Sequence, residues 1–292
     1  MSISAADVKA LREDTGAGMM DCKKALTDAD GDVAEAKKIL REKGLAAAGK
    51  RADRSAGEGL VVARISDDET VGVLVEVNSE TDFVAKGERF AQLGDAIADI
   101  AFAAGGTIDG DAKSAVDALV EDARIDLQEK IEFAGAVGFT TETGLVHAYL
   151  HSTGGWSDKG VLVELESDAL DREKLRALAH DLSLHIQFAR PPYLVREEVP
   201  EDVLASEREI AAAKARNEGK PEDIIERIAD GVVNKYYKQN VLVDQAYVRD
   251  DKLNVQKWLD TESGGSARVV RFARFEVGEG AEDAPEDAQG EG

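Results

Sequence analysis

The spacing of apolar residues over the first fifty positions predicts three short helices. Ser4 and Asp7 resemble a capping box, in which each side chain bonds the backbone amide of the other, ahead of a helical apolar face. A second helix is expected from about Met19, and Asp32 caps a third helix that Gly44 is expected to close. A unit of this size buries only a small core.

Two adjacent methionines stand at the start of the second helix. Because the three-helix unit has little interior, Met19 and Met20 are not easily buried together, and one of them is expected to face a partner. The alternative is that both flexible side chains fill irregular gaps in the core. The sequence leaves both interpretations open.

Beyond this unit the pattern changes from helical spacing to β-branched runs. Residues 44–59 are rich in Ala and Gly with a few basic residues, and they lack a sustained apolar face, which predicts a linker. Residues 60–65 and 70–78 are expected to form two strands joined by a polar hairpin loop. A helix is predicted over residues 88–104, and a further helical stretch continues toward Phe133.

A phrase in the second of these strands reappears later in the chain. GVLVEVNSE at residues 72–80 is matched by GVLVELESD at residues 160–168, and each copy ends in a similar helical phrase, at residues 100–103 and 186–189. The likeness spans a strand, a connection and a helix, so it indicates an internal duplication. The first copy has two extra residues and the segment TDFVA at residues 81–85, whose apolar group lacks a counterpart in the second copy.

The second copy predicts another small α+β unit. Strands are expected at residues 145–150 and 160–166 around an expanded Gly-rich loop at residues 152–159, followed by a helix over residues 171–189. A late strand is expected over residues 268–277, after a short helix.

Between these elements the pattern after residue 192 is wholly helical, with one break at residues 219–221. Apolar residues recur at spacing four from Ile224 to Tyr236, and the other faces are charged. A stripe this narrow predicts a projecting antiparallel coiled-coil hairpin at about residues 197–238.

Composition limits the partners. The chain has 292 residues, enough for about two domains, and its net charge of −23 disfavours simple binding to a nucleic-acid backbone over most of the surface. Cys22 is the single cysteine, so an internal disulfide is excluded and a reducing compartment fits. The first residues lack the layout of a secretion signal, and no apolar run approaches the ~20 residues of a membrane span. We expect a soluble cytoplasmic protein that binds other proteins.

The sequence predicts neither a cofactor, a metal site nor covalent catalysis. It has no G-x-x-x-x-G-K-[ST] phosphate loop, and the four histidines form no recognised ligand pair. The serines lack a G-x-S-x-G setting, and the many carboxylates of an acidic chain single out no acid-base pair. A binding protein is the remaining interpretation.

Three phrases resemble bacterial elongation factor Ts: LREDTGAGMMDCKKAL at residues 11–26, TDFVA at residues 81–85 and RFEVGEG at residues 274–280. The resemblance implies an α+β fold with an N-terminal three-helix module like a ubiquitin-associated domain, a duplicated core with small antiparallel sheets and an inserted antiparallel coiled-coil hairpin. The expected divisions are the module with the start of the linker (1–54), the first core unit (55–140), the second core unit with the hairpin (141–277) and an acidic disordered tail (278–292).

The resemblance also implies a function. The family acts as guanine-nucleotide exchange factor for elongation factor Tu, a GTPase that this chain would bind in its GDP form, without direct contact to nucleic acid or membrane. Phe83 would enter a crevice in the partner and disturb its magnesium coordination, and Asp82 would fix how the ring enters. The implied exchange segment is Thr81, Asp82, Phe83 and Val84, and the implied partner-binding residues are Arg12, Met19, Met20, Lys23 and His151.

Two alternatives remain at this point. An aromatic residue beside a strand commonly fills the core of its own domain, so Phe83 could be a core residue. The chain could also be a helical adaptor or scaffold that binds proteins without exchange activity. The sequence leaves open whether the factor forms a homodimer or a 2:2 assembly with its partner.

Overall fold

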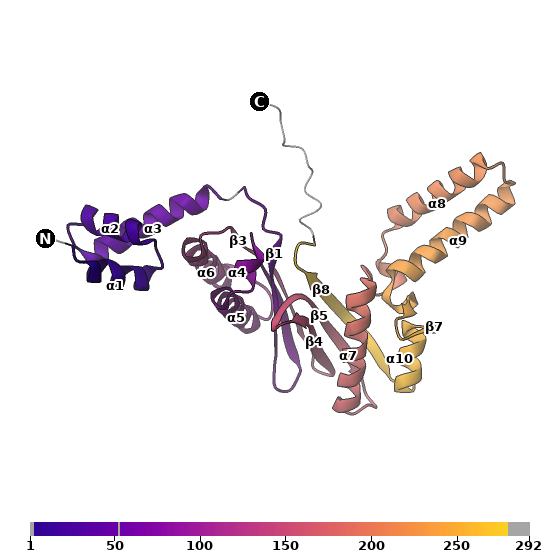
Figure 1. The fold of residues 1–292 in the computed structure, drawn as a ribbon. Coiled ribbons are helices and arrows are strands. Elements are labelled where there is room, and N and C mark those ends of the chain that lie inside the picture. The colour runs from indigo at the N-terminus through magenta and orange to yellow at the C-terminus, as the bar shows by residue number, and fades with distance from the viewer. Residues whose placement is uncertain (1–2, 52, 280–292) are drawn as a thin grey trace.

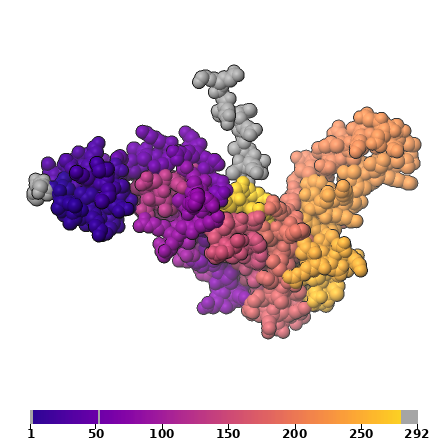
Figure 2. Space-filling model, viewed as in Figure 1, coloured from indigo at the N-terminus to yellow at the C-terminus, as the bar shows by residue number. Residues whose placement is uncertain are grey.

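The chain folds as an α+β protein with small antiparallel sheets, as predicted. A computed structural model describes residues 3–51 and 53–279. A helical module lies at one end, two sheets with their helices form the body, and a helical hairpin projects from the opposite end (Figures 1 and 2). Within those two ranges, no helix combines the length and the apolar character that a membrane span requires. The tail expected at residues 278–292 lies outside the described residues from position 280 onward.

The N-terminal module consists of α1 (Ala5–Thr15), α2 (Met19–Asp28) and α3 (Val33–Gly49). The predicted capping box forms, because Asp7 N donates to Ser4 Oγ at 3.2 Å and Ser4 N donates to Asp7 Oδ2 at 3.0 Å. Apolar side chains from all three helices make up its core, namely Val8, Leu11, Cys22, Ala25, Leu26, Ala36 and Leu40.

Helix α3 runs past Gly44, where its end was predicted. It continues to Gly49, so the linker expected at residues 44–59 begins only after this helix. The glycine has a packing role, because a Cβ atom at this position would lie 2.6 Å from the Cγ2 atom of Ile125 in α6 (Gly110–Leu127). Gly44 therefore allows α3 to approach α6 closely and does not act as a cap.

Two three-stranded antiparallel sheets form the body, with strand orders β1-β2-β3 and β4-β5-β8. Their strands are β1 (Glu58–Ile65), β2 (Val71–Ser79), β3 (Ile131–Thr140), β4 (Gly144–Thr153), β5 (Trp156–Ser167) and β8 (Ala267–Glu276). The repeated phrase lies in the central strand of each sheet. In each sheet, the pairing between the central strand and the last strand shifts register. The shift follows the same residue of the phrase in both sheets, Glu76 in β2 and Glu164 in β5. These equivalences support an internal duplication.

The two sheets pack against each other through the repeated phrase. A Cβ atom on Gly160 would lie 2.8 Å from Leu74 Cδ1, and a Cβ atom on Gly72 would lie 3.1 Å from Leu162 Cδ1. Each glycine therefore leaves room for the equivalent leucine of the other copy. Both leucines are fully buried, in a cluster that also contains Val61, Phe139 and Val146.

Helices cover the sheets on their other faces. The first sheet carries α5 (Glu88–Ala103) and α6, and the second carries α7 (Arg172–Ala189) and α10 (Val255–Ser263) (Figure 1). A single helical turn, α4 (Asp82–Ala85), connects β2 to α5. Each half of the body has its own apolar core beneath its helices.

Two segments differ from their predicted structure. Phe133 belongs to β3 and not to a helix, since α6 ends where Gln128 adopts a left-handed backbone with φ of 57° and the chain then pairs with β2. Residues 152–159 do not form an expanded loop. They extend β4 and β5 into a hairpin that turns at Gly154 and Gly155, whose φ values of 66° and 85° suit glycine in a tight turn.

Helices α8 (Glu201–Asn217) and α9 (Glu222–Asn240) form the predicted antiparallel hairpin. The apolar stripe from Ile224 to Tyr236 is only half-buried. The two helices pack together at positions next to this stripe, where α8 contributes small side chains. The buried seam consists of Ala211, Ala215, Ile225 and Ala229. The region expected to be wholly helical also contains two short paired strands, β6 (Ala246–Tyr247) and β7 (Asp250–Asn254).

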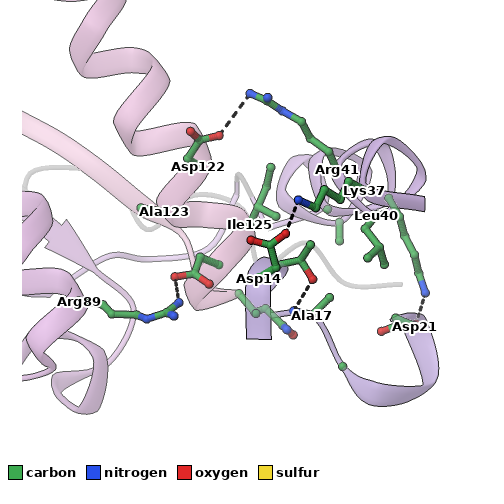
Figure 3. Close-up of a pocket in the computed structure, with 18 of the residues that line it drawn as sticks. Asp14, Ala17, Asp21, Lys37, Leu40, Arg41, Arg89, Asp122, Ala123 and Ile125 are labelled. Atoms are coloured by element: carbon green, nitrogen blue, oxygen red, sulfur yellow. Dashed lines mark hydrogen bonds and ion pairs between the residues drawn. The ribbon is translucent and has the colours of Figure 1, made fainter. Parts of the chain in front are cut away.

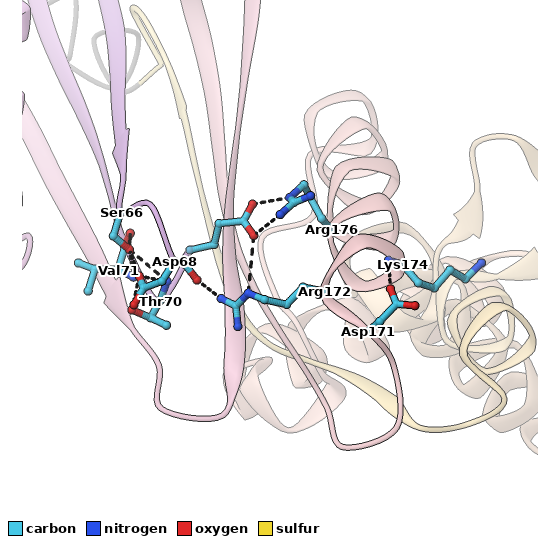
Figure 4. A network of polar contacts seen from close by, with 9 residues as sticks. Ser66, Asp68, Thr70, Val71, Asp171, Arg172, Lys174 and Arg176 are labelled. Carbon is cyan, nitrogen blue, oxygen red and sulfur yellow. Dashed lines mark hydrogen bonds and ion pairs between the residues drawn. The ribbon is translucent and has the colours of Figure 1, made fainter.

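A carboxylate in the β1–β2 loop joins the first half of the body to a helix of the second. Glu69 Oε2 accepts a hydrogen bond from Arg176 Nη2 at 2.7 Å, and Arg172 Nε lies 3.8 Å from the same carboxylate (Figure 4). The hydrogen bond from Arg176 lowers the pKa of Glu69. The Glu69 carbonyl also accepts from Val146 N at 2.8 Å, so the loop is tied to both α7 and β4.

Filling the space at Gly160 is expected to weaken the contact between the sheets. The new methyl group of Gly160→Ala would lie 2.7 Å from Val61 Cγ1 and 2.8 Å from Leu74 Cδ1, so the free energy of unfolding should fall by about 1–3 kcal/mol. Gly231→Ala in α9 is the matched control, because among the described residues nothing beyond its own stretch of helix lies within 4 Å of the new methyl group. The helix should therefore gain roughly 0.5–1 kcal/mol. Urea denaturation measures both, and equal stabilities would contradict the packing.

Burial of the His147 imidazole predicts sensitivity to acid. Burial, reinforced by the nearby His180, lowers the pKa of His147 from 6.5 to about 4. The unfolded chain therefore takes up this proton near pH 6.5 and the folded chain only near pH 4, so stability present above pH 6.5 falls by about 2 kcal/mol by pH 5. His147→Phe should remove this part of the pH dependence in urea denaturation at pH 7 and pH 5. An unchanged pH dependence would contradict the assignment.

Candidate functional site

The segment that distinguishes the two repeats forms α4. Thr81 caps this turn, with its Oγ1 atom 3.4 Å from the donor Val84 N. Ala85 is buried and Val84 packs against the first core, so one side of the turn is attached to the body. Phe83 lies on the other side and is 86% exposed. The alternative that Phe83 fills the core of its own domain is therefore wrong.

An ion pair fixes the carboxylate beside the ring. Lys86 Nζ donates to Asp82 Oδ2 at 2.8 Å, one helical turn away. This hydrogen bond lowers the pKa of Asp82, which is therefore an anion at neutral pH. The same ammonium group lies 5.3 Å from the centre of the Trp156 ring in the β4–β5 hairpin. The α4 segment thus contacts an element of the second sheet.

Two further carboxylates hold the start of the turn. Glu129, in the loop between α6 and β3, accepts from Thr81 Oγ1 at 2.6 Å and from Thr81 N at 3.1 Å. Glu80 accepts from Lys130 N at 2.6 Å and from Arg54 Nη1 at 3.1 Å. Burial acts to raise the pKa of Glu80, but these hydrogen bonds outweigh it and lower the pKa. The end of β2 is thereby tied to the loop before β3.

His151 lies near the end of β4, in the hairpin that reaches α4. Its side chain is exposed, and its Nδ1 atom is 3.0 Å from the hydroxyl of Tyr149 on the same face of the strand. Trp156, just across the hairpin turn, packs against the core of the first half. His151 and the segment with Phe83 are therefore carried by neighbouring elements.

The other expected partner contacts lie apart from α4, on the N-terminal module. The side chains of Met19 and Met20 are 52% and 74% exposed, so the alternative that both fill gaps in the core is wrong. The exposed residues of this group are Arg12, Met19, Met20 and Lys23. The module therefore offers a second surface, with apolar and basic side chains.

A cleft of about 730 Å³ lies between the N-terminal module and helices α5 and α6 (Figure 3). Arg41 Nη2 lies 3.3 Å from Asp122 Oδ1 across it, and Lys37 pairs with Asp14 within the module. Most of the charged groups that line the cleft are thus paired with one another. We interpret it as the seam that positions the module, and not as a ligand site.

The geometry around α4 suits contact with another protein. An exposed ring beside a fixed carboxylate projects from the surface, whereas small-molecule sites are concave. Among residues 3–51 and 53–279, no three His, Cys, Asp or Glu side chains are grouped so that they could hold a metal ion. The arrangement can present an apolar group and a negative charge together to a partner.

The sequence indicated the exposed ring but not the residues that hold it. The difference between the two repeats was the signal for Phe83. Glu129 is 48 positions from Thr81, and no local spacing pattern connects them. The sequence did not indicate Trp156 either, because its contact with Lys86 depends on how the two sheets pack.

Comparisons with known proteins point in one direction. A family model described as Elongation factor TS matches residues 80–279, which include α4, the central strand of the second sheet and the helical hairpin. Elongation factor Ts of Acidothermus cellulolyticus is 46% identical, over 95% of this chain and 99% of the relative. The proteins of that name from Clostridium botulinum and Syntrophotalea carbinolica are 42% and 43% identical, over 98% of this chain and 96% and 97% of their own lengths. This chain belongs to the elongation factor Ts family.

Proposed function

We propose that this chain is a guanine-nucleotide exchange factor that binds the GDP-bound form of elongation factor Tu and promotes GDP release. Membership of the family indicates elongation factor Tu as the partner. The observation that supports the mechanism is the exposed Phe83 ring beside the ionised Asp82. No covalent bond of the nucleotide has to change, so the factor needs no acid-base pair of its own. The activity belongs in the cytoplasm, where the GTPase delivers aminoacyl-tRNA to the ribosome.

Exchange requires preferential binding to one conformation of the partner. The GTPase holds GDP through phosphate-loop amides and a magnesium ion, and a factor accelerates release if it binds better when those contacts are damaged. In this proposal Phe83 enters a crevice between helices of the nucleotide domain and shifts them, which disturbs magnesium coordination. Asp82 accepts hydrogen bonds at the edge of the crevice, and Thr81 and Val84 keep the turn in place.

The ring alone does not hold the complex together. Burying one phenylalanine contributes roughly 1.5–3 kcal/mol, which can displace a helix but cannot also anchor two proteins. The second surface on the N-terminal module and the hairpin with His151 are the proposed anchors. Their side chains are exposed and lie on separate elements, so they can engage the partner at several points.

Thermodynamic coupling explains how the complex separates. If the factor weakens nucleotide binding, nucleotide must weaken factor binding by the same ratio. Each ~1.4 kcal/mol of unfavourable coupling weakens either ligand about tenfold. A coupling free energy of a few times this amount allows rapid exchange without an irreversible complex. GTP then replaces GDP because it is the more concentrated nucleotide.

Removing the ring should impair exchange and spare the fold. Phe83→Ala is expected to slow factor-stimulated release of fluorescent GDP from elongation factor Tu by at least about tenfold, because the burial of one ring is lost. Its melting temperature should stay close to that of the parent, since the ring is 86% exposed. Stopped-flow fluorescence measures the rate at several magnesium concentrations.

Phe188→Ala is the matched control, because this phenylalanine of α7 is also exposed, at 80%. Its GDP release should equal that of the parent. A large fall in the melting temperature of Phe83→Ala would show that the ring stabilises its own domain. Tight binding of the parent chain with no acceleration of GDP release would instead identify an adaptor.

Polar substitution of the module's methionines should weaken binding to elongation factor Tu without changing the maximal rate of GDP release. In a Met19→Ser, Met20→Ser double variant, the factor concentration for half-maximal GDP release should rise roughly tenfold or more, as apolar contact area is lost. The maximal rate should persist because α4 is intact. Val33→Ser, at an apolar side chain of α3 that is 49% exposed, is the control. If the half-maximal factor concentration is unchanged in both variants, the module is not part of the interface with elongation factor Tu.

A further inference from the structure

Glu129 holds the first residue of the α4 turn by two hydrogen bonds. Its Oε1 atom accepts the hydroxyl proton of Thr81 at 2.6 Å, and its Oε2 atom accepts the amide proton of Thr81 at 3.1 Å. A carboxylate can accept on both oxygens, and such charge-assisted bonds are stronger than neutral ones. Both the backbone and the side chain of Thr81 are therefore fixed by one group from a distant loop.

The turn that carries Phe83 is too short to fix the orientation of the ring by itself. Helix α4 has only four residues, and a helix this short is not stable by itself. Because the Thr81 hydroxyl gives its proton to Glu129, its oxygen lone pairs remain for the amide of Val84, 3.4 Å away. Without Glu129 the N-terminal end of the turn would depend on the neutral hydrogen bond that Ser79 Oγ donates to the Thr81 carbonyl at 3.2 Å, while the buried Ala85 still holds the other end.

The loop that carries Glu129 is itself held on both sides. Lys130 N donates to Glu80 Oε1 at 2.6 Å, which ties the loop to the end of β2. Arg124 Nε, in the last turn of α6, donates to the carbonyl of Ile131 at 2.7 Å. The Glu129 carboxylate is therefore a fixed reference point for α4 and not a mobile surface charge.

We propose that Glu129 is a positioning residue for nucleotide exchange, acting through Thr81 to keep the Phe83 ring directed outward before the partner arrives. This inference rests on the proposed exchange function. Pre-organisation reduces the freedom that the ring loses when it is inserted. When the turn is released, only a fraction of bound factors has the ring in a productive direction, and the rate of GDP release falls by that fraction.

The kinetic test compares three variants of the full chain with elongation factor Tu bound to fluorescent GDP. Glu129→Ala should lower the maximal rate about tenfold, equivalent to ~1.4 kcal/mol, and leave the half-maximal factor concentration within about twofold. Glu129→Gln can still accept the Thr81 amide proton and donate to the hydroxyl, so it should retain the rate within roughly threefold. Thr81→Val removes the hydroxyl that donates to Glu129 and caps Val84 but keeps the amide bond to Glu129, so it should also lower the maximal rate.

A double-mutant cycle separates positioning from an independent contact. If Glu129 acts through the ring, Glu129→Ala should have no further effect in a Phe83→Ala background. Effects that multiply would show that Glu129 acts by another route and would overturn the inference. A general loss of stability in Glu129→Ala would lower the melting temperature and the rate together, and in that case the Gln and Val variants decide the question.

Hydrogen–deuterium exchange of the free factor provides a readout that does not depend on activity. The amides of Thr81 and Val84 should exchange faster in Glu129→Ala than in the parent, while those of β2 remain protected. Unchanged protection of both amides, or a parent-like maximal rate in all three variants, would overturn the inference. A parent chain that fails to accelerate GDP release would overturn the proposed function instead, and the exchange data would still report on the Glu129 contact.

Discussion

The rest of the structure depends on the contact between the two sheets. Leu74 and Leu162 each occupy the space left by a glycine of the other repeat, so the same nine-residue phrase supplies both sides of the interface. This reciprocal packing fixes how one half of the body lies on the other. As a result, the β4–β5 hairpin reaches α4 through Trp156, and the loop with Glu69 reaches α7. An interface built from close-packed side chains is stiff, which suits the proposed displacement of helices in the partner.

The α4 segment shows how a short element gains rigidity from its surroundings. An exposed aromatic side chain contributes little to the stability of its own domain, and a single helical turn has little stability of its own. Its order comes from contacts with three separate elements: the first core below Val84, the loop with Glu129, and the hairpin with Trp156. The ion pair with Lys86 holds the Asp82 carboxylate beside the ring. The segment thus presents an apolar group next to a fixed carboxylate.

Glycine caused the main errors of prediction, because its roles in turns and in close packing look alike in a sequence. Gly44 suggested a helix end but allows α3 to approach α6. The glycines of residues 152–159 suggested a loop but form a tight turn between long strands. The β3 strand around Phe133 was missed because it is rich in small residues and its pairing partner, β2, lies about sixty positions earlier.

The sequence by itself determined the local features: the capping box at Ser4, the repeated strand–helix phrase, the coiled-coil hairpin, and the unmatched segment that displays Phe83. These features depend on neighbouring residues, so spacing and comparison of the two copies were sufficient. Tertiary structure alone decided that Glu129 holds Thr81 and that Trp156 lies over Lys86. Those contacts join residues far apart in the chain, and they exist because the packing of the sheets and helices sets their positions.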